Sequence, residues 1–284
     1  MLHSLINLRR NAHDALSDLP ALKLKAEKVA AHILHGGHGQ RKAGGHEKFW
    51  QYREYQNSDR PQDIDWRQSA KTDHVYVREK EQQNPQSFYF WAQNDESMRF
   101  QSNVASYSKC EAAQILSLAL AILLTNSDER VGMVGQRVSI GDQALDKIGI
   151  SLLNDDTGAL PEGHIPAKSN VFLCGDFLSP IEDIELQLNA FFKPGVRGHL
   201  IQILDPAECD LPYDGHVIFE NAHAQDSYKI ENVADIRKDY KKRIEQHLQD
   251  IGAVCNRLGL KHIVHITDQS LESTLIKIWE AYQR

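Results

Sequence analysis

After residue 85, short apolar runs alternate with longer helical segments, and this alternation constrains the fold more than any other feature. Runs of about five apolar residues have the length of buried strands, whereas segments of ten or more residues with helical spacing have the length of crossover helices. Strands are expected at 88–92, 130–134, 170–174, 198–204 and 262–266, and helices at 109–125, 142–153, 180–192, 234–258 and 271–282. Residues 217–220 and 228–230 suggest a short hairpin. The pattern predicts an α/β fold: an open, mainly parallel sheet with helices on both faces.

The chain before residue 86 follows a different pattern. Residues 4–34 have helical spacing, and Pro20 is expected to interrupt them and begin a second helical stretch. Residues 49–56 and 74–80 alternate aromatic and charged side chains, as short strands do, and a turn-rich connection separates them. We therefore expect N-terminal helices over 1–35, a small β-rich unit over 36–85 and the α/β domain over 86–284.

Composition restricts the class of protein. The chain has 41% hydrophobic and 25% charged residues and a net charge of −7, which is typical of a soluble globular protein and disfavours nucleic-acid binding by bulk charge. The longest apolar run, 115–124, is too short to span a bilayer, and the N-terminus lacks the pattern of a signal peptide. Four scattered Cys residues suit a reducing compartment. These features predict a cytoplasmic protein without a membrane-spanning segment.

Polar side chains follow two of the expected strands. Asp95 and Ser97 come after the 88–92 strand, and Asp176 comes after the 170–174 strand. Ligands of open α/β sheets bind at the carboxyl ends of strands, and hard oxygen ligands suit a magnesium-type ion. These three residues are therefore candidate metal ligands, and one functional hypothesis is a metal-dependent enzyme. The alternative is that these side chains are solvated or cap local structure.

Residues 47–80 interleave aromatic side chains with cations. Such a pattern can stack nucleic-acid bases, so nucleic-acid binding by residues 36–80 is one hypothesis. Seven acidic residues lie in the same stretch, which favours internal ion pairs and a surface for protein docking. The chain has no G-x-S-x-G elbow, no phosphate-binding loop and no G-x-G-x-x-G turn, so a nucleophilic or nucleotide-dependent enzyme has no motif to support it.

The segment 46–81, HEKFWQYREYQNSDRPQDIDWRQSAKTDHVYVREKE, resembles the signature region of domain of unknown function 58, a MoxR-associated bacterial family. The resemblance continues through SMRFQS, SKCEAAQILSLALAILL, ERVGMVG, GDFLSP and LDPAE, and so covers nearly the whole chain. It is carried in the signature region by Glu47, Arg53, Tyr55, Asp59, Ile64, Asp65, Trp66, Ser69, Ala70, Val77 and Arg78. Ser58 stands where the family often has Gly.

The resemblance implies a von Willebrand factor A-like domain, in which a D-x-S-x-S loop, a Thr and a second Asp bind a divalent cation. In this chain Gln93 falls at the first Asp, Asp95 at the first Ser, Ser97 at the second Ser and Asp176 at the distal Asp. No Thr matches convincingly, Thr157 being the nearest. A Gln cannot supply the charge of an Asp, so the implied site is degenerate.

The resemblance further implies a function without catalysis. The expected protein is an adaptor of the short soluble type that acts with a MoxR-type AAA+ ATPase in protein maturation or complex assembly. Its client is not implied. The candidate partner-binding residues are those of the signature region, namely Arg53, Tyr55, Asp59, Asp65, Trp66 and Arg67.

Overall fold

The computed structural model describes residues 2–35, 49–56, 59–72, 74–80, 85–154, 158, 160, 165–220 and 227–283. The chain forms two compact units, one from residues 1–38 with 86–284 and one from residues 39–85. Each unit is described by itself. No helix among the described residues has both the length and the apolar character that crossing a membrane requires.

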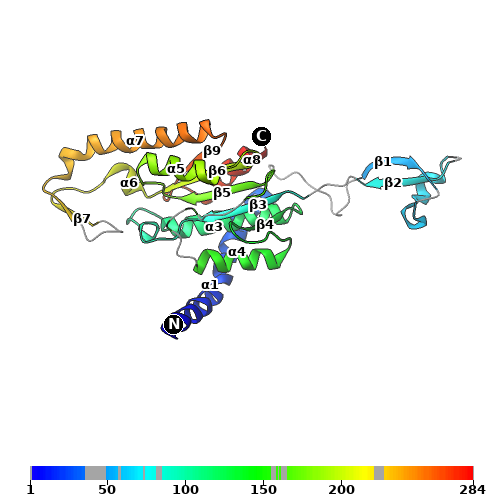
Figure 1. Ribbon diagram of the computed structural model, residues 1–284, viewed down its shortest axis with the longest axis horizontal. Coiled ribbons are helices and arrows are strands. Elements are labelled where there is room, and N and C mark those ends of the chain that lie inside the picture. The colour runs from blue at the N-terminus through cyan, green and yellow to red at the C-terminus, as the bar shows by residue number, and fades with distance from the viewer. Residues whose placement is uncertain are drawn as a thin grey trace. The chain divides into compact units, whose positions relative to one another are not determined.

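A five-stranded parallel sheet forms the centre of the larger unit (Figure 1). Its strands are β3 (Ser87–Ala92), β4 (Arg130–Met133), β5 (Asn170–Gly175), β6 (Arg197–Leu204) and β9 (Lys261–Ile266), in the spatial order β4-β3-β5-β6-β9. All four neighbouring pairs are parallel. The predicted α/β class with an open parallel sheet is therefore confirmed, and the arrangement is consistent with a von Willebrand factor A-like fold.

Helices cover both faces of this sheet (Figure 1). Phe88, Phe90 and Ala92 of β3 face a core formed with α3 (Lys109–Thr125), α4 (Asp142–Asn154) and α8 (Leu271–Gln283). Tyr89 and Trp91 face the opposite core, formed with α5 (Ile181–Phe191) and α7 (Val233–Arg257). Each helix and strand predicted over residues 86–284 is confirmed to within one residue at either end.

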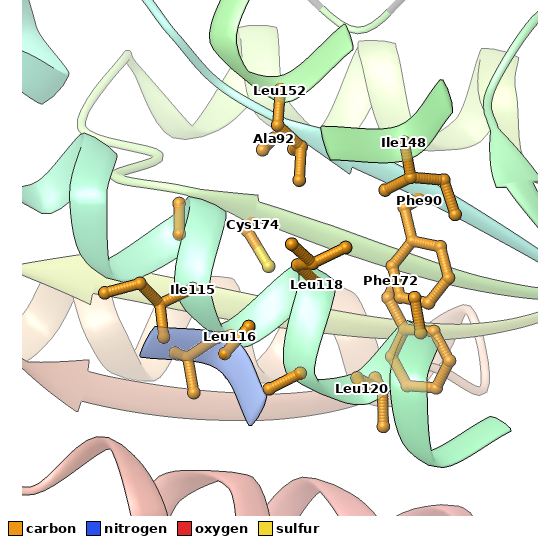
Figure 2. Packing of buried hydrophobic residues seen from close by; sticks show 14 of the residues in the cluster. Phe90, Ala92, Ile115, Leu116, Leu118, Leu120, Ile148, Leu152, Phe172 and Cys174 are labelled. Carbon is orange, nitrogen blue, oxygen red and sulfur yellow. The ribbon is translucent and has the colours of Figure 1, made fainter. Parts of the chain in front are cut away.

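Helix α3 is buried along most of its length. The side chain of Ser108 caps its first turn by accepting a hydrogen bond from the Glu111 amide at 3.1 Å. Leucine and isoleucine side chains of α3 then pack beneath Phe90 and Phe172, whose rings stack with centroids 5.6 Å apart (Figure 2). This packing fixes where the first turn of α3 lies relative to the ends of the strands.

The expected break at Pro20 is wrong, because α1 is one continuous helix, Leu2–His35, with Pro20 inside it. Pro20 is exposed, as is Leu16, whose carbonyl loses its usual helical donor. Water can satisfy that carbonyl, while buried side chains such as Leu19 and Leu22 hold the opposite face against the domain. Helix α1 packs on α3, α4 and α8 as a further layer.

Shorter elements complete the larger unit. A 3₁₀ turn, η2 (Ser97–Arg99), follows β3, and a five-residue helix, α6 (Pro206–Asp210), follows β6. The expected hairpin is present as β7 (Val217–Glu220) and β8 (Ser227–Ile230). The sequence pattern did not predict α6, which carries Glu208 at the carboxyl edge of the sheet.

The smaller unit is a two-stranded antiparallel ribbon with a helical insertion. The predicted strands are confirmed as β1 (Phe49–Glu54) and β2 (Tyr76–Lys80). The connection between them contains η1 (Pro61–Asp63) and α2 (Trp66–Ser69), and Ile64 bridges to Val77 of β2. Residues 36–48 of the expected β-rich region lie outside the described residues.

Candidate functional site

The strand order places a topological switch point between β3 and β5. The chain leaves β3 for β4 on one side and then returns to form β5 on the other side of β3. The loops that follow β3 and β5 therefore meet at the carboxyl edge of the sheet, where open α/β folds bind their ligands. The loop after β3 carries Gln93, Asp95 and Ser97, and the loop after β5 carries Asp176.

The structure brings the three candidate metal ligands together. Ser97 Oγ lies 2.7 Å from Asp95 Oδ1 and 2.6 Å from Asp176 Oδ2. Both carboxylates are buried, with exposed fractions of 9% for Asp95 and 4% for Asp176. Asp95 Oδ1 also accepts the Met98 amide at 3.3 Å, so this side chain caps the turn as well. Both readings of Asp95, a cluster residue and a local cap, therefore apply.

Gln93 turns its amide nitrogen toward the two polar side chains of its own loop. Its Oε1 accepts the backbone N–H of Asp176 at 3.0 Å, and that donor fixes the orientation of the amide. Its Nε2 therefore donates to Asp95 Oδ2 at 3.0 Å. Gly175 makes room for this contact, because a Cβ there would lie only 2.6 Å from Gln93 Oε1. The side chain at the first Asp position thus presents a donor to the cluster.

Lys109, in the first turn of α3, completes the cluster from the side of the helix. Its side chain is fully buried, and its Nζ lies 3.1 Å from Asp176 Oδ2 and 2.5 Å from Glu208 Oε1. We call Gln93, Asp95, Ser97, Lys109, Asp176 and Glu208 the strand-end cluster. Burial lowers the pKa of Lys109, but the carboxylates of Glu208 and Asp176 raise it more, so that the group stays charged.

The two carboxylates bound to Lys109 differ in their surroundings. Burial alone would raise the pKa of Asp176, yet the charge of Lys109 and the hydrogen bonds from Ser97 and Lys109 bring it below its ordinary value. Burial also raises the pKa of Glu208, and here it outweighs the effect of Lys109, leaving that pKa above its ordinary value. Asp176 is therefore the more acidic of the two carboxyl groups and the main anionic partner of the ammonium group.

Glu208 is held in place by the local structure of α6. Its Oε2 accepts the Asp205 backbone N–H at 2.9 Å and the Asp205 side chain accepts the Glu208 backbone N–H, which together form a capping box. The Asp205 side chain also accepts the Ala207 N–H at 2.8 Å. Tyr240 of α7 donates its hydroxyl to the Glu208 carbonyl at 2.7 Å. Glu208 thus joins the helix layer on one face of the sheet to the cluster at its edge.

The arrangement does not fit a tightly bound divalent metal. The Asp176 oxygen that faces Ser97 is also bound by a buried ammonium group, and Gln93 offers a nitrogen donor where the metal site of the resembled fold has a carboxylate. Within the part of the chain that the structure describes, no group of three His, Cys, Asp or Glu side chains could hold a metal ion. Thr157 lies outside the described residues, although a Cβ on its neighbour Gly158 would lie 3.2 Å from Asp95 Oδ2.

Reasoning from the sequence missed Lys109 and Glu208, and both had a signal. A lysine in the first turn of a mostly apolar helix opposes the helix dipole, so it needs an anionic partner. Residues 205–208, DPAE, have the spacing of a capping box with Pro at the first helical position. Cys174, by contrast, lies in the core, where burial raises its pKa to about 12.

The candidate partner-binding residues of the smaller unit divide into two groups. The Arg53 guanidinium donates two hydrogen bonds, of 3.0 and 2.9 Å, to the Asp59 carboxylate, and this pairing lowers the pKa of Asp59. Asp65 caps α2 by accepting the Gln68 N–H at 3.0 Å. These side chains, with Tyr55, whose hydroxyl lies 3.5 Å from the Asp59 carbonyl, are engaged within the unit.

Trp66 and Arg67 form the second group, because both are exposed. The Trp66 side chain, at the first position of α2, has an exposed fraction of 66%. A tryptophan is among the most costly side chains to leave in water, and exposed tryptophan and arginine are enriched among the residues that dominate protein interfaces. The first group therefore acts as a frame that holds the second group at the surface.

Three comparisons bear on the identity of this arrangement, and one of them gives a match. The family model described as "Protein of unknown function DUF58" matches residues 51–145 and 153–250, which include most of the signature region, the whole strand-end cluster and most of α7. No curated protein and no solved structure matches the chain.

Proposed function

The chain belongs to the DUF58 family, and on this premise we propose that it is a protein-interaction module and not an enzyme. In this proposal it acts in the cytoplasm as an adaptor of a MoxR-type AAA+ ATPase, in the maturation or assembly of a client protein. The family resemblance supplies the ATPase as the partner to test. The structure supplies the surface on which to test it.

Trp66 is the observation that carries the proposal. Its indole is exposed at the start of a four-residue helix whose first turn is fixed by the Asp65 cap. The neighbouring loop is fixed in turn by the fork between Arg53 and Asp59. An aromatic side chain with few rotatable bonds on a fixed backbone loses little entropy when a partner covers it, which is what an interface anchor needs.

The strand-end loops provide a second contact surface in this proposal. Asp95 and Asp176 are buried and bound within the cluster, so a partner would meet their exposed neighbours. Phe100, Val104 and Leu178 have exposed fractions of 39%, 63% and 39% on these loops. Changing Asp95 and Asp176 to Ala should therefore disturb the fold, because it removes the partner of a buried ammonium group, and is unsuitable as a test of docking.

The ammonium group of Lys109 and the buried thiols of the larger unit are poor nucleophiles, which supports a binding role over catalysis. Lys109 is charged and closed off from solvent, so its ammonium is not a nucleophile. The thiols of Cys110, Cys174 and Cys255 are buried, and burial raises their pKa values to about 11, 12 and 11. These thiols are therefore inert at neutral pH.

Co-purification of the full chain with a MoxR-type ATPase from the same organism tests the proposal. The complex should be recovered in at least one state among nucleotide-free, ADP-bound and ATP-analogue-bound ATPase. Absence of a complex in all three states would contradict the proposed function. The competing hypothesis, a metal-dependent enzyme using Asp95, Ser97 and Asp176, predicts turnover of a model ester in the presence of magnesium or manganese.

A further inference from the structure

We propose that Lys109 is the permanent cation of the strand-end cluster, so that the site keeps its shape without a divalent metal. The proposal concerns the chemistry of the cluster and does not depend on the proposed function. It follows from the position of the ammonium group, from the orientation of Gln93 and from the three segments that Lys109 joins, namely α3, the end of β5 and α6.

The ammonium group lies between two carboxylates whose negative charge it offsets. Lys109 Nζ lies 3.1 Å from Asp176 Oδ2, the same oxygen that lies 2.6 Å from Ser97 Oγ. Its second carboxylate contact is Glu208 Oε1, 2.5 Å away. The Lys109 side chain has no exposed surface, so its ammonium group cannot reach solvent and stays beside the carboxylates.

The supply of hydrogen-bond donors also favours a closed cluster. Ser97 has one hydroxyl proton, but its Oγ lies within hydrogen-bonding distance of oxygens from both Asp95 and Asp176. Gln93 Nε2 adds a donor for Asp95, and Lys109 Nζ adds a donor for Asp176. Each carboxylate thus has a nitrogen donor besides the shared hydroxyl.

A divalent ion entering this cluster would meet opposing charge. Two like charges a few ångströms apart repel strongly when protein, and not water, surrounds them. The ion would also find the Gln93 oxygen already engaged by the Asp176 amide at 3.0 Å. Lys109 therefore has the structural role of a bound metal ion, because its ammonium group links the start of α3 to the end of β5 and to helix α6.

Thermal unfolding of the full chain in chelator, magnesium, manganese or calcium tests this role directly. The wild-type chain should unfold at the same temperature in all four conditions. A rise of about 5 °C or more with any of these ions, of the size that a saturated native-state site produces, would overturn the proposal.

A second experiment asks whether the cluster binds a metal once the ammonium group is removed. The double variant Lys109→Ala with Gln93→Asp removes the ammonium group and introduces a carboxylate beside Asp95 and Asp176. We expect its unfolding temperature to be lower in chelator and to rise by about 5 °C or more with magnesium or manganese. If the folded variant shows no such rise, the ammonium is not standing where a metal would bind, and the proposal fails.

The control is a lysine that pairs with the same short helix at the surface. Lys241 Nζ lies 2.6 Å from Asp210 Oδ1, and both side chains are largely exposed. Lys241→Met should leave the unfolding temperature and its independence from metals unchanged. Should the double variant fail to fold in any condition, the wild-type comparison still decides the proposal.

Discussion

The ammonium nitrogen of Lys109 lies 3.1 Å from Asp176 Oδ2, and neither side chain is more than 5% exposed. This pair links the first turn of α3 to the end of β5 at the switch point of the sheet. A buried ion pair often contributes little net stability compared with a well-packed apolar pair, but removal of one partner leaves an uncompensated charge. The pair is therefore a sensitive point of the domain.

Replacing Lys109 by Met should destabilise the protein strongly. The substitution keeps the length of the side chain but leaves Asp176 and Glu208 buried without their ammonium partner. Losses of this kind cost about 3–5 kcal/mol. Chemical denaturation should show this decrease in the free energy of unfolding for Lys109→Met.

The exposed pair between Lys241 and Asp210 is the comparison for that measurement, because surface pairs contribute only about 0–1 kcal/mol. If Lys109→Met and Lys241→Met were equally stable, the central role of the buried ammonium would be refuted.

His199 should make stability depend on pH. It lies in β6, is 5% exposed and stacks on Phe172 with ring centroids 4.6 Å apart. Burial lowers its pKa from 6.5 to about 4, so the unfolded chain binds a proton that the folded chain does not. The stabilisation is complete above pH 6.5 and is lost as the pH falls toward 4.

The variant His199→Phe should remove this part of the pH dependence while keeping the ring stack. A difference of 2.5 pH units corresponds to at most about 3 kcal/mol between pH 6.5 and 4. Part of the slope should persist, because burial also lowers the pKa of His265 to about 4. Replacement of the exposed His216 by Gln should have no such effect, and an unchanged profile in His199→Phe would contradict the assignment.

The fork between Arg53 and Asp59 should control the rigidity of the smaller unit. Asp59 Oδ2 accepts the Gln56 backbone N–H at 2.8 Å as well as binding Arg53. In Asp59→Ala, hydrogen exchange at Gln56 should become faster, while exchange in α3 of the other unit should not change. Asp214→Ala, which removes an exposed partner of Arg237, is the matched control. Unaltered exchange at Gln56 in Asp59→Ala would show that the fork is not a constraint.

The fold was largely predictable because strand and helix spacing is a local property of the sequence. Helix 109–125 and hairpin strand 217–220 were predicted to the residue, since apolar runs and turn residues bound them clearly. Pro20 misled the prediction, because its cost depends on whether the freed Leu16 carbonyl meets water, which only the packing of α1 decides.

The candidate site was only partly predictable. The convergence of Asp95, Ser97 and Asp176 follows from the rule for strand ends, which needs no long-range information. Lys109 and Glu208 come from segments far apart in the chain, 99 residues from each other, and their meeting depends on how α3 and α6 pack. Likewise, the resemblance marked Arg53 and Trp66 alike, whereas the structure separates the paired side chain from the exposed one.

The affinity of the full chain for a MoxR-type ATPase, the partner proposed above, compared between wild type and Trp66→Ala, tests the central claim most directly. Truncation of an interface anchor should weaken binding at least about tenfold. Leu186→Ala, which removes an equally exposed apolar side chain from α5, should leave the affinity unchanged. Equal binding by wild type and Trp66→Ala would contradict the assignment of this surface to the partner.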